Sequence, residues 1–157
     1  MQELVKLLKD RGLKISVAES CTGGMFMSEL TSVPGASEVF SCGYVTYSDI
    51  SKIRILGVNP HTLAVYGAVS EETVEEMLEG LLAETEAGIV CAISGIAGPS
   101  GGTADKPAGT VFAGFCIRGS LVKKTERFNF AGDRDQIRRA SVKELSGMII
   151  KEIGAVN

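Results

Sequence analysis

The sequence predicts an α/β protein: a three-layer α/β/α sandwich with a mixed, mostly parallel sheet and one antiparallel hairpin strand. Two observations favour this fold class. Helical spacing of apolar residues alternates with short, wholly apolar runs, which is typical of strands buried between two helix layers. Towards the C-terminus, two strand-like segments are separated by Gly119-Ser120, which favours a two-residue hairpin turn and therefore an antiparallel strand.

The elements of the N-terminal half follow from local signals. Leucines at helical spacing predict a first helix, and a glycine follows at the expected stop. Mixed aromatic and β-branched residues indicate the second strand. In order, we expect a helix ending at Gly12, a strand over 13–17, a helix over 25–30, a strand over 39–47, and a helix over 50–56 that is capped by Ser48 or Asp49 and ended by Gly57.

The C-terminal half carries two further cap signals. Ser70 precedes an amphipathic helix with an acidic first turn, and Asp133 and Gln136 have the spacing of a capping box. Charged residues over 121–130 favour an edge strand. In order, we expect a helix after Ser70, a buried strand over 88–93, a strand over 110–117, the edge strand, and a last helix over 134–153.

The length of 157 residues and the net charge of −3 fit one globular domain over residues 1–157. No apolar run approaches the ~20 residues that cross a bilayer, and the N-terminus reads as an amphipathic helix rather than a signal peptide. No basic stripe suits a phosphate backbone. We therefore expect a cytoplasmic protein that binds neither membrane nor nucleic acid.

Hydroxyl, thiol and glycine residues are concentrated over 18–24, where a strand is followed by a helix. The first N–H groups of a helix have no internal partner and favour an oxygen that becomes anionic. A nucleophile such as Ser20 would therefore have an oxyanion site within reach. The alternative is that Ser20 or Thr22 only caps the helix, while Gly23 and Gly24 only turn the chain.

A second unusual stretch, 94–103, is glycine-rich and follows a buried strand. It matches neither the Walker loop nor the dinucleotide fingerprint. Ligands of open α/β sheets bind beyond the carboxyl ends of the strands, so this loop and the 18–24 turn face one another if their strands are parallel neighbours. The alternative is a long flexible connection. The backbone groups and hydroxyls expected around a ligand belong to Ser94, Gly95, Ile96, Ala97 and Gly98.

A serine nucleophile here needs a base other than histidine. The chain has one histidine, His61, in a turn or helix start that is typical of the surface. Lys52 follows Tyr47 by five residues and becomes a base only if burial or a nearby cation lowers its pKa from ~10.4. Tyr47 would then relay or hold the proton. The alternative is a surface lysine on a helix.

Three more residues have candidate roles. Cys21 is a rival nucleophile, since a thiolate at a helix N-terminus is stabilised. Glu19 either orients Lys52 or caps backbone groups. Arg134 could bind a phosphate bidentately. The four cysteines show no C-x-x-C spacing, so we predict neither a metal nor a cofactor.

Four motifs in this order resemble the C-terminal domain of the CinA family of competence/damage-inducible proteins. They are Ala18-Glu19-Ser20-Cys21-Thr22-Gly23-Gly24, Tyr47-Ser48-x-x-x-Lys52, Gly95-Ile96-Ala97-Gly98-Pro99 with Lys106-Pro107-x-Gly109-Thr110-Val111, and Phe130-x-Gly132-Asp133-Arg134. The resemblance covers nearly the whole chain. The family often carries a larger N-terminal domain, which has no counterpart in this sequence, so we expect the stand-alone form. The family commonly has Thr where this chain has Ser94, and the hydroxyl is kept.

The resemblance implies a nicotinamide-nucleotide amidohydrolase that deamidates nicotinamide mononucleotide (NMN) without a metal. It implies Ser20 as nucleophile, Lys52 as general base and Tyr47 as its partner. We also expect a homo-oligomer. The alternatives are a nucleotide- or partner-binding module without catalysis, and a hydrolase that uses Cys21. The substrate-binding residues expected are Glu19, Cys21, Thr22, Gly23, Gly24, Ser94, Gly95, Ile96, Ala97, Gly98 and Arg134.

Overall fold

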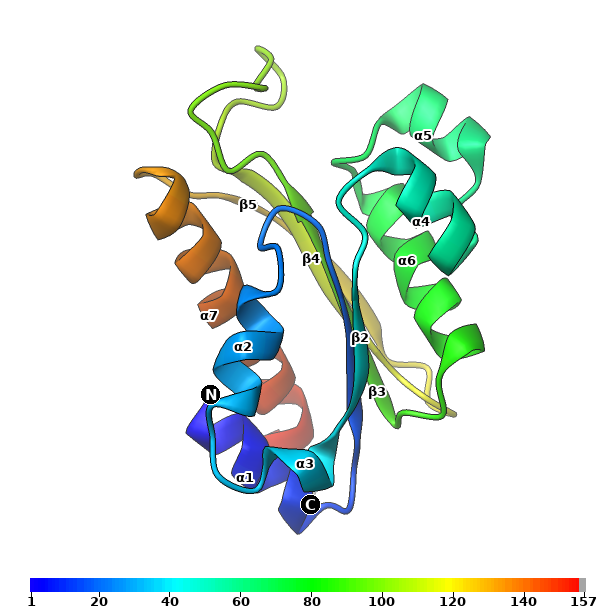
Figure 1. Cartoon of the computed structure of the whole chain (residues 1–157), viewed down its shortest axis with the longest axis vertical. Helices are drawn as coiled ribbons and strands as arrows, with labels where there is room; N and C mark the ends of the chain where they lie inside the picture. The colour runs from blue at the N-terminus through cyan, green and yellow to red at the C-terminus, as the bar shows by residue number, and fades with distance from the viewer. Residues whose placement is uncertain (156–157) are drawn as a thin grey trace.

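The computed structural model describes residues 1–155, which form a five-stranded sheet covered by helices on both faces (Figure 1). The strand order is β2-β1-β3-β4-β5. β1 pairs in parallel with β2 and β3, whereas β4 is antiparallel to both β3 and β5. The predicted α/β sandwich with a mixed sheet is therefore confirmed. The strands are β1 (Ile15–Glu19), β2 (Phe40–Val45), β3 (Ile89–Gly95), β4 (Thr110–Ile117) and β5 (Lys123–Asn129).

The helices divide between the two faces of the sheet. Figure 1 shows α1, α2, α3 and α7 on one face and α4, α5 and α6 on the other. No helix within residues 1–155 is both long and apolar enough to span a membrane. The helices are α1 (Gln2–Asp10), α2 (Met25–Thr31), α3 (Ala36–Val39), α4 (Asp49–Leu56), α5 (Pro60–Tyr66), α6 (Glu71–Glu84) and α7 (Arg134–Ala155).

The period of two along the buried strands decides which side chains enter which core. In β3, Ile89, Cys91 and Ile93 pack in the core beneath α1, α2 and α7. Val90 and Ala92 pack in the second core, beneath α4 and α6. Because side chains alternate along a strand, Ser94, two residues after Ala92, is directed towards the same α4–α6 face.

Most element boundaries agree with the local signals, and the exceptions have physical causes. The first strand is Ile15–Glu19 rather than 13–17, because Glu19, although charged, is buried within it. The hairpin connection runs from Arg118 to Val122, with Ile117 N–H bonded to the Val122 carbonyl, so the two-residue turn prediction is wrong. Helix α3 was not predicted because four residues are too few to show periodicity.

Candidate active site

The carboxyl ends of the three parallel strands are held together by backbone hydrogen bonds. Ser20 N–H donates to the Ile93 carbonyl at 2.9 Å, and Thr46 N–H donates to the Glu19 carbonyl at 2.8 Å. β1 and β3 are parallel neighbours, so the 18–24 turn and the loop after β3 lie at the same edge of the sheet, as predicted. Ser20 therefore sits at the end of a central strand, between the ends of β2 and β3.

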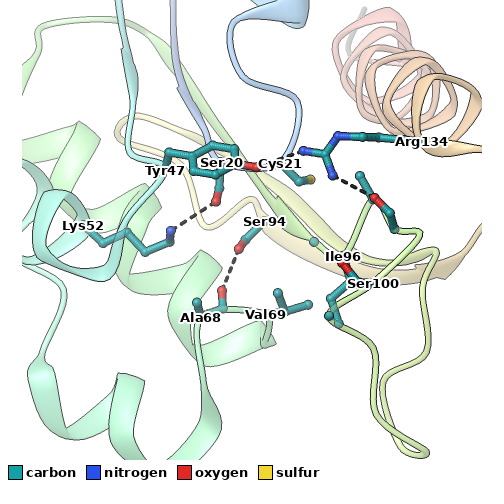
Figure 2. A pocket seen from close by; sticks show the side chains of 14 residues that line it. Ser20, Cys21, Tyr47, Lys52, Ala68, Val69, Ser94, Ile96, Ser100 and Arg134 are labelled. Atoms are coloured by element: carbon teal, nitrogen blue, oxygen red, sulfur yellow. Dashed lines mark hydrogen bonds between the residues drawn. The ribbon is translucent and has the colours of Figure 1, made fainter.

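Lys52 reaches this position from α4, the helix that follows β2. Ser48 and Ser51 form a capping box that starts α4, and Gly57 ends the helix in the left-handed conformation. The side chain of Lys52 is 0% exposed. Its Nζ lies 3.1 Å from Ser20 Oγ (Figure 2). The same amine donates to the Thr46 carbonyl at 2.8 Å. Lys52 is therefore not a surface lysine; it is buried against the candidate nucleophile.

The surroundings of Lys52 favour its neutral form. Burial lowers the pKa of the Lys52 amine from its usual value, while the nearby Asp49 and Cys21 act in the opposite direction. The Thr46 carbonyl can only accept a hydrogen bond, so it takes one N–H of the amine. The lone pair of a neutral Lys52 is then free to face Ser20, which is the arrangement that a general base requires.

Ser20 and Lys52 open onto a cavity of about 250 Å³ at this edge of the sheet. Its wall combines the β1 and β2 ends, the α5–α6 connection, the loop after β3 and the start of α7. The lining residues are Ser20, Cys21, Tyr47, Lys52, Ala68, Val69, Ser94, Gly95, Ile96, Ala97, Gly98, Ser100, Gly101 and Arg134.

Arg134 connects three parts of the cavity rim. Its Nη1 donates to the Gly98 carbonyl and its Nη2 to the Tyr47 hydroxyl, each at 2.9 Å. Tyr47 is 60% exposed, and its hydroxyl meets Arg134 rather than Lys52. The structure thus differs from the expectation that Tyr47 contacts Lys52. It is the carbonyl of Thr46, one residue earlier, that holds the lysine.

The Glu19 side chain binds backbone N–H groups and does not face the cavity. Its buried carboxylate accepts hydrogen bonds from the N–H groups of Gly24 at 3.0 Å, Phe26 at 3.2 Å and Met27 at 2.9 Å. Of the two roles considered for Glu19, the structure supports capping of the α2 N-terminus. Glu19 does not line the cavity, so a substrate-binding role for it is not supported.

Thr22, Gly23 and Gly24 were expected to bind substrate, but they do not line the cavity either. Gly23 N–H donates to the Ser20 carbonyl at 3.1 Å, and Gly24 N–H is bonded to Glu19. Gly24 has φ +94, so it turns the chain into α2 in a conformation that other residues rarely adopt. The two glycine amides are therefore engaged internally. The Gly95–Gly98 segment does border the cavity, with its Ile96 N–H bonded to the Thr110 carbonyl at 2.8 Å.

Cys21 lines the cavity but is a poor nucleophile. It is 6% exposed, and burial raises the pKa of its thiol to about 12. Desolvation, together with the negative charge of Glu19, outweighs the backbone hydrogen bond and the nearby cations that would stabilise a thiolate. The geometry therefore favours Ser20 over Cys21.

Two pairs of lining residues were not singled out from the sequence. Ala68 and Val69 belong to the connection between α5 and α6, and the one available signal was the Ser70 cap, which places a helix start here. Ser100 and Gly101 lie within the glycine-rich loop that the sequence predicts to be functional, without any feature that distinguishes them from their neighbours.

Comparison with known proteins finds relatives of both the sequence and the fold. A CinA-like protein of Thermotoga maritima is 56% identical over 142 residues, which are 90% of this chain and 34% of that protein. The chain therefore spans about a third of the length of this relative. The crystal structure of the competence damage-inducible protein A from Klebsiella pneumoniae superposes with a TM-score of 0.93 at 37% identity, covering 99% of this chain and 95% of that one. A CinA superfamily protein of Escherichia coli gives 0.88 at 33%, covering 96% and 89%.

The fold and the site define a three-layer α/β protein with a buried serine–lysine pair at the carboxyl edge of its sheet. The model of the CinA C-terminal domain matches residues 1–153. The chain belongs to this family.

Proposed function

We propose that the chain is a serine/lysine amidohydrolase that converts NMN to nicotinic acid mononucleotide and ammonia. The observation that carries this proposal is the buried contact of 3.1 Å between Lys52 Nζ and Ser20 Oγ. A serine needs an adjacent base to become a nucleophile, and a desolvated lysine supplies one. The resemblance of the four motifs to the amidohydrolase family supports NMN as the substrate.

The reaction would proceed through an acyl-enzyme. Ser20 Oγ attacks the carboxamide carbon while its proton passes to Lys52 Nζ. The tetrahedral intermediate collapses, the C–N bond breaks, and Lys52 delivers the proton to the departing nitrogen, which leaves as ammonia. Water then attacks the ester carbon and gives a proton to Lys52, which returns it to Ser20 as the acid is released.

The size of the cavity suggests how NMN would be oriented. At about 250 Å³ it is smaller than the ~300–1,000 Å³ of typical ligand pockets, so the nicotinamide end enters and the phosphate stays at the rim. Arg134 lies at that rim and uses two of its five N–H groups on protein partners. Within residues 1–155 the remaining N–H groups have no protein acceptor, so they can form the charge-assisted bonds that a phosphate accepts.

Ammonia release from NMN without added metal tests the proposal, with nicotinamide and nicotinamide riboside as controls. We expect release from NMN alone, and a fall in turnover of about 10³-fold or more in Ser20→Ala. Ser37→Ala, at an exposed serine on α3, is the matched control and should keep full activity. Undiminished turnover in Ser20→Ala would contradict the mechanism. Tight binding of NMN without ammonia release would support the binding module instead.

A further inference from the structure

Ser94 occupies the position next to Ser20 on the neighbouring strand. Glu19 of β1 is in register with Ile93 of β3, so the following residues, Ser20 and Ser94, are side by side. Adjacent strands are about 4.8 Å apart, and in-register side chains share a face of the sheet. Both residues line the cavity, and Figure 2 shows the Ser20 hydroxyl directed towards Lys52 and the Ser94 hydroxyl towards Ala68.

The proton of the Ser94 hydroxyl is committed to the protein. Ser94 is 0% exposed, and its Oγ lies 2.6 Å from the carbonyl of Ala68 (Figure 2). A carbonyl oxygen only accepts, so Ser94 must supply the hydrogen. Within residues 1–155, this carbonyl has no other hydrogen-bond donor, and rotation of the hydroxyl would leave it unpaired. Towards the cavity, Ser94 therefore presents lone pairs alone.

Three other polar side chains of the cavity carry hydrogen-bond donors. Lys52 and Arg134 carry N–H groups. The Tyr47 hydroxyl accepts from Arg134, which leaves its own proton free to be donated. Ser94 is thus an acceptor in a cavity where Arg134, Tyr47 and the amine of Lys52 carry hydrogens that can be donated.

We propose that Ser94 is a specificity-determining residue that accepts a hydrogen bond from the NH₂ group of a primary carboxamide and disfavours a carboxylate in the same place. This inference rests on the proposed function and adds the basis for telling substrate from product. A carboxamide has two N–H donors, whereas a carboxylate presents lone pairs that oppose those of Ser94. The departing nitrogen would lie between Ser94 and Lys52, where it can receive its proton, and the acid product would be released readily.

Binding without turnover tests this selectivity. We would measure dissociation constants by calorimetry for NMN and nicotinic acid mononucleotide with Ser20→Ala, then with Ser94→Ala or Ser94→Thr added. Ser20→Ala should prefer the amide by about tenfold or more, the value of one well-placed hydrogen bond. Ser94→Ala should bring the two constants within about threefold of each other, and Ser94→Thr should retain the preference.

A merely structural role of Ser94 would weaken both ligands equally and leave their ratio unchanged. Ser141→Ala is the matched control, because Ser141 is also a buried serine whose hydroxyl donates to a backbone carbonyl, that of Ile137, within α7. It should leave the ratio at its Ser20→Ala value. If Ser94→Ala does not fold, Ser94→Cys replaces it, since sulfur is a weak acceptor, and the same loss of preference is expected.

The two proposals fail separately. If the unmutated chain releases no ammonia from NMN, the proposed function is wrong, but a preference for the amide that disappears in Ser94→Ala still supports the role of Ser94. If ammonia is released and the amide-to-acid ratio does not change in Ser94→Ala, the inference about Ser94 is overturned and the proposed function stands. Equal dissociation constants for NMN and nicotinic acid mononucleotide in Ser20→Ala would also overturn the inference about Ser94.

Discussion

The hydroxyl of Tyr47 accepts a hydrogen bond from Arg134, which lies 87 residues further along the chain, at a distance of 2.9 Å. The same guanidinium holds the carbonyl of Gly98. One side chain at the start of α7 therefore joins the residue after β2 to the glycine-rich loop, and this junction forms the part of the cavity rim at which we place the phosphate of NMN.

Removal of this guanidinium should weaken substrate binding more than chemistry. We expect Arg134→Ala to raise the KM for NMN by about 10- to 100-fold, the range of a charge-assisted hydrogen-bond pair, with a smaller fall in kcat. Arg134→Lys should not restore KM, because one ammonium cannot reproduce the forked contacts to Gly98 and Tyr47. Steady-state kinetics would measure both constants. Arg139→Ala, at an exposed arginine on the same helix, is the control, and an unchanged KM in Arg134→Ala would refute the rim role.

The activity should depend on pH through Lys52. A general base must be neutral, so kcat/KM should rise with pH as Lys52 loses its proton. Because burial lowers the pKa of Lys52, the midpoint of the rise should lie below the usual lysine value of 10.5. Lys52→Arg should cost about 10²–10⁴-fold, since a guanidinium stays protonated. A pH–rate profile of kcat/KM measures this rise. The control variant Lys143→Arg, at an exposed lysine, should give the same profile as the unmutated chain.

Replacement of Asp49 should shift the pH range over which kcat/KM rises, in a direction that the charge of Asp49 predicts. Its negative charge stabilises the protonated form of Lys52 and so raises the pKa of that amine. Asp49→Asn should therefore lower this pKa and shift the rising limb to more acidic pH, by a few tenths of a pH unit because the carboxylate is exposed and screened. Asp135→Asn, on α7, should leave the limb in place. A shift to more alkaline pH would show that Lys52 is not the group being titrated.

Cys21 should prove dispensable for the chemistry. Because burial raises the pKa of this thiol to about 12, the thiolate is a minor form at pH 8. We expect Cys21→Ser to retain ammonia release within about tenfold of the unmutated rate, and iodoacetamide to modify this buried thiol slowly. Mass spectrometry of the alkylated protein beside the activity assay would follow both. Complete loss of turnover in Cys21→Ser would restore the cysteine hydrolase as the better mechanism.

Glu19 should matter for stability rather than for substrate affinity. Glu19→Ala leaves the N–H groups of Gly24, Phe26 and Met27 without their carboxylate, so we expect the free energy of unfolding to fall by about 3 kcal/mol or more. For a chain of this size that lowers Tm by roughly 6–12 °C. Thermal unfolding monitored by circular dichroism is the measurement. Glu29→Ala, on the same helix, should change the free energy by no more than about 0.5 kcal/mol.

Local signals were sufficient for much of the fold. The Ser48 cap and the Gly57 stop of α4 are both where the sequence places them, as is the reciprocal capping box of Asp133 and Gln136. Each of these signals involves residues within a few positions of one another, so composition and spacing reveal them. The 18–24 turn and the loop after β3 could be placed at one edge of the sheet because parallel strands present their carboxyl ends together.

The sequence by itself determined the order of the strands and of most helices, the carboxyl-edge location of the site and the residue types available for chemistry there. Tertiary structure decided the depth of Lys52, the hydroxyl partner of Tyr47, the choice of backbone capping for Glu19, and the use of the Ser94 proton. The reason is physical. These contacts join groups that are brought together only by the packing of α4, α7 and the α5–α6 connection against the sheet. Burial, which lowers the pKa of Lys52 and raises that of Cys21, is likewise a property of the packed chain rather than of either residue.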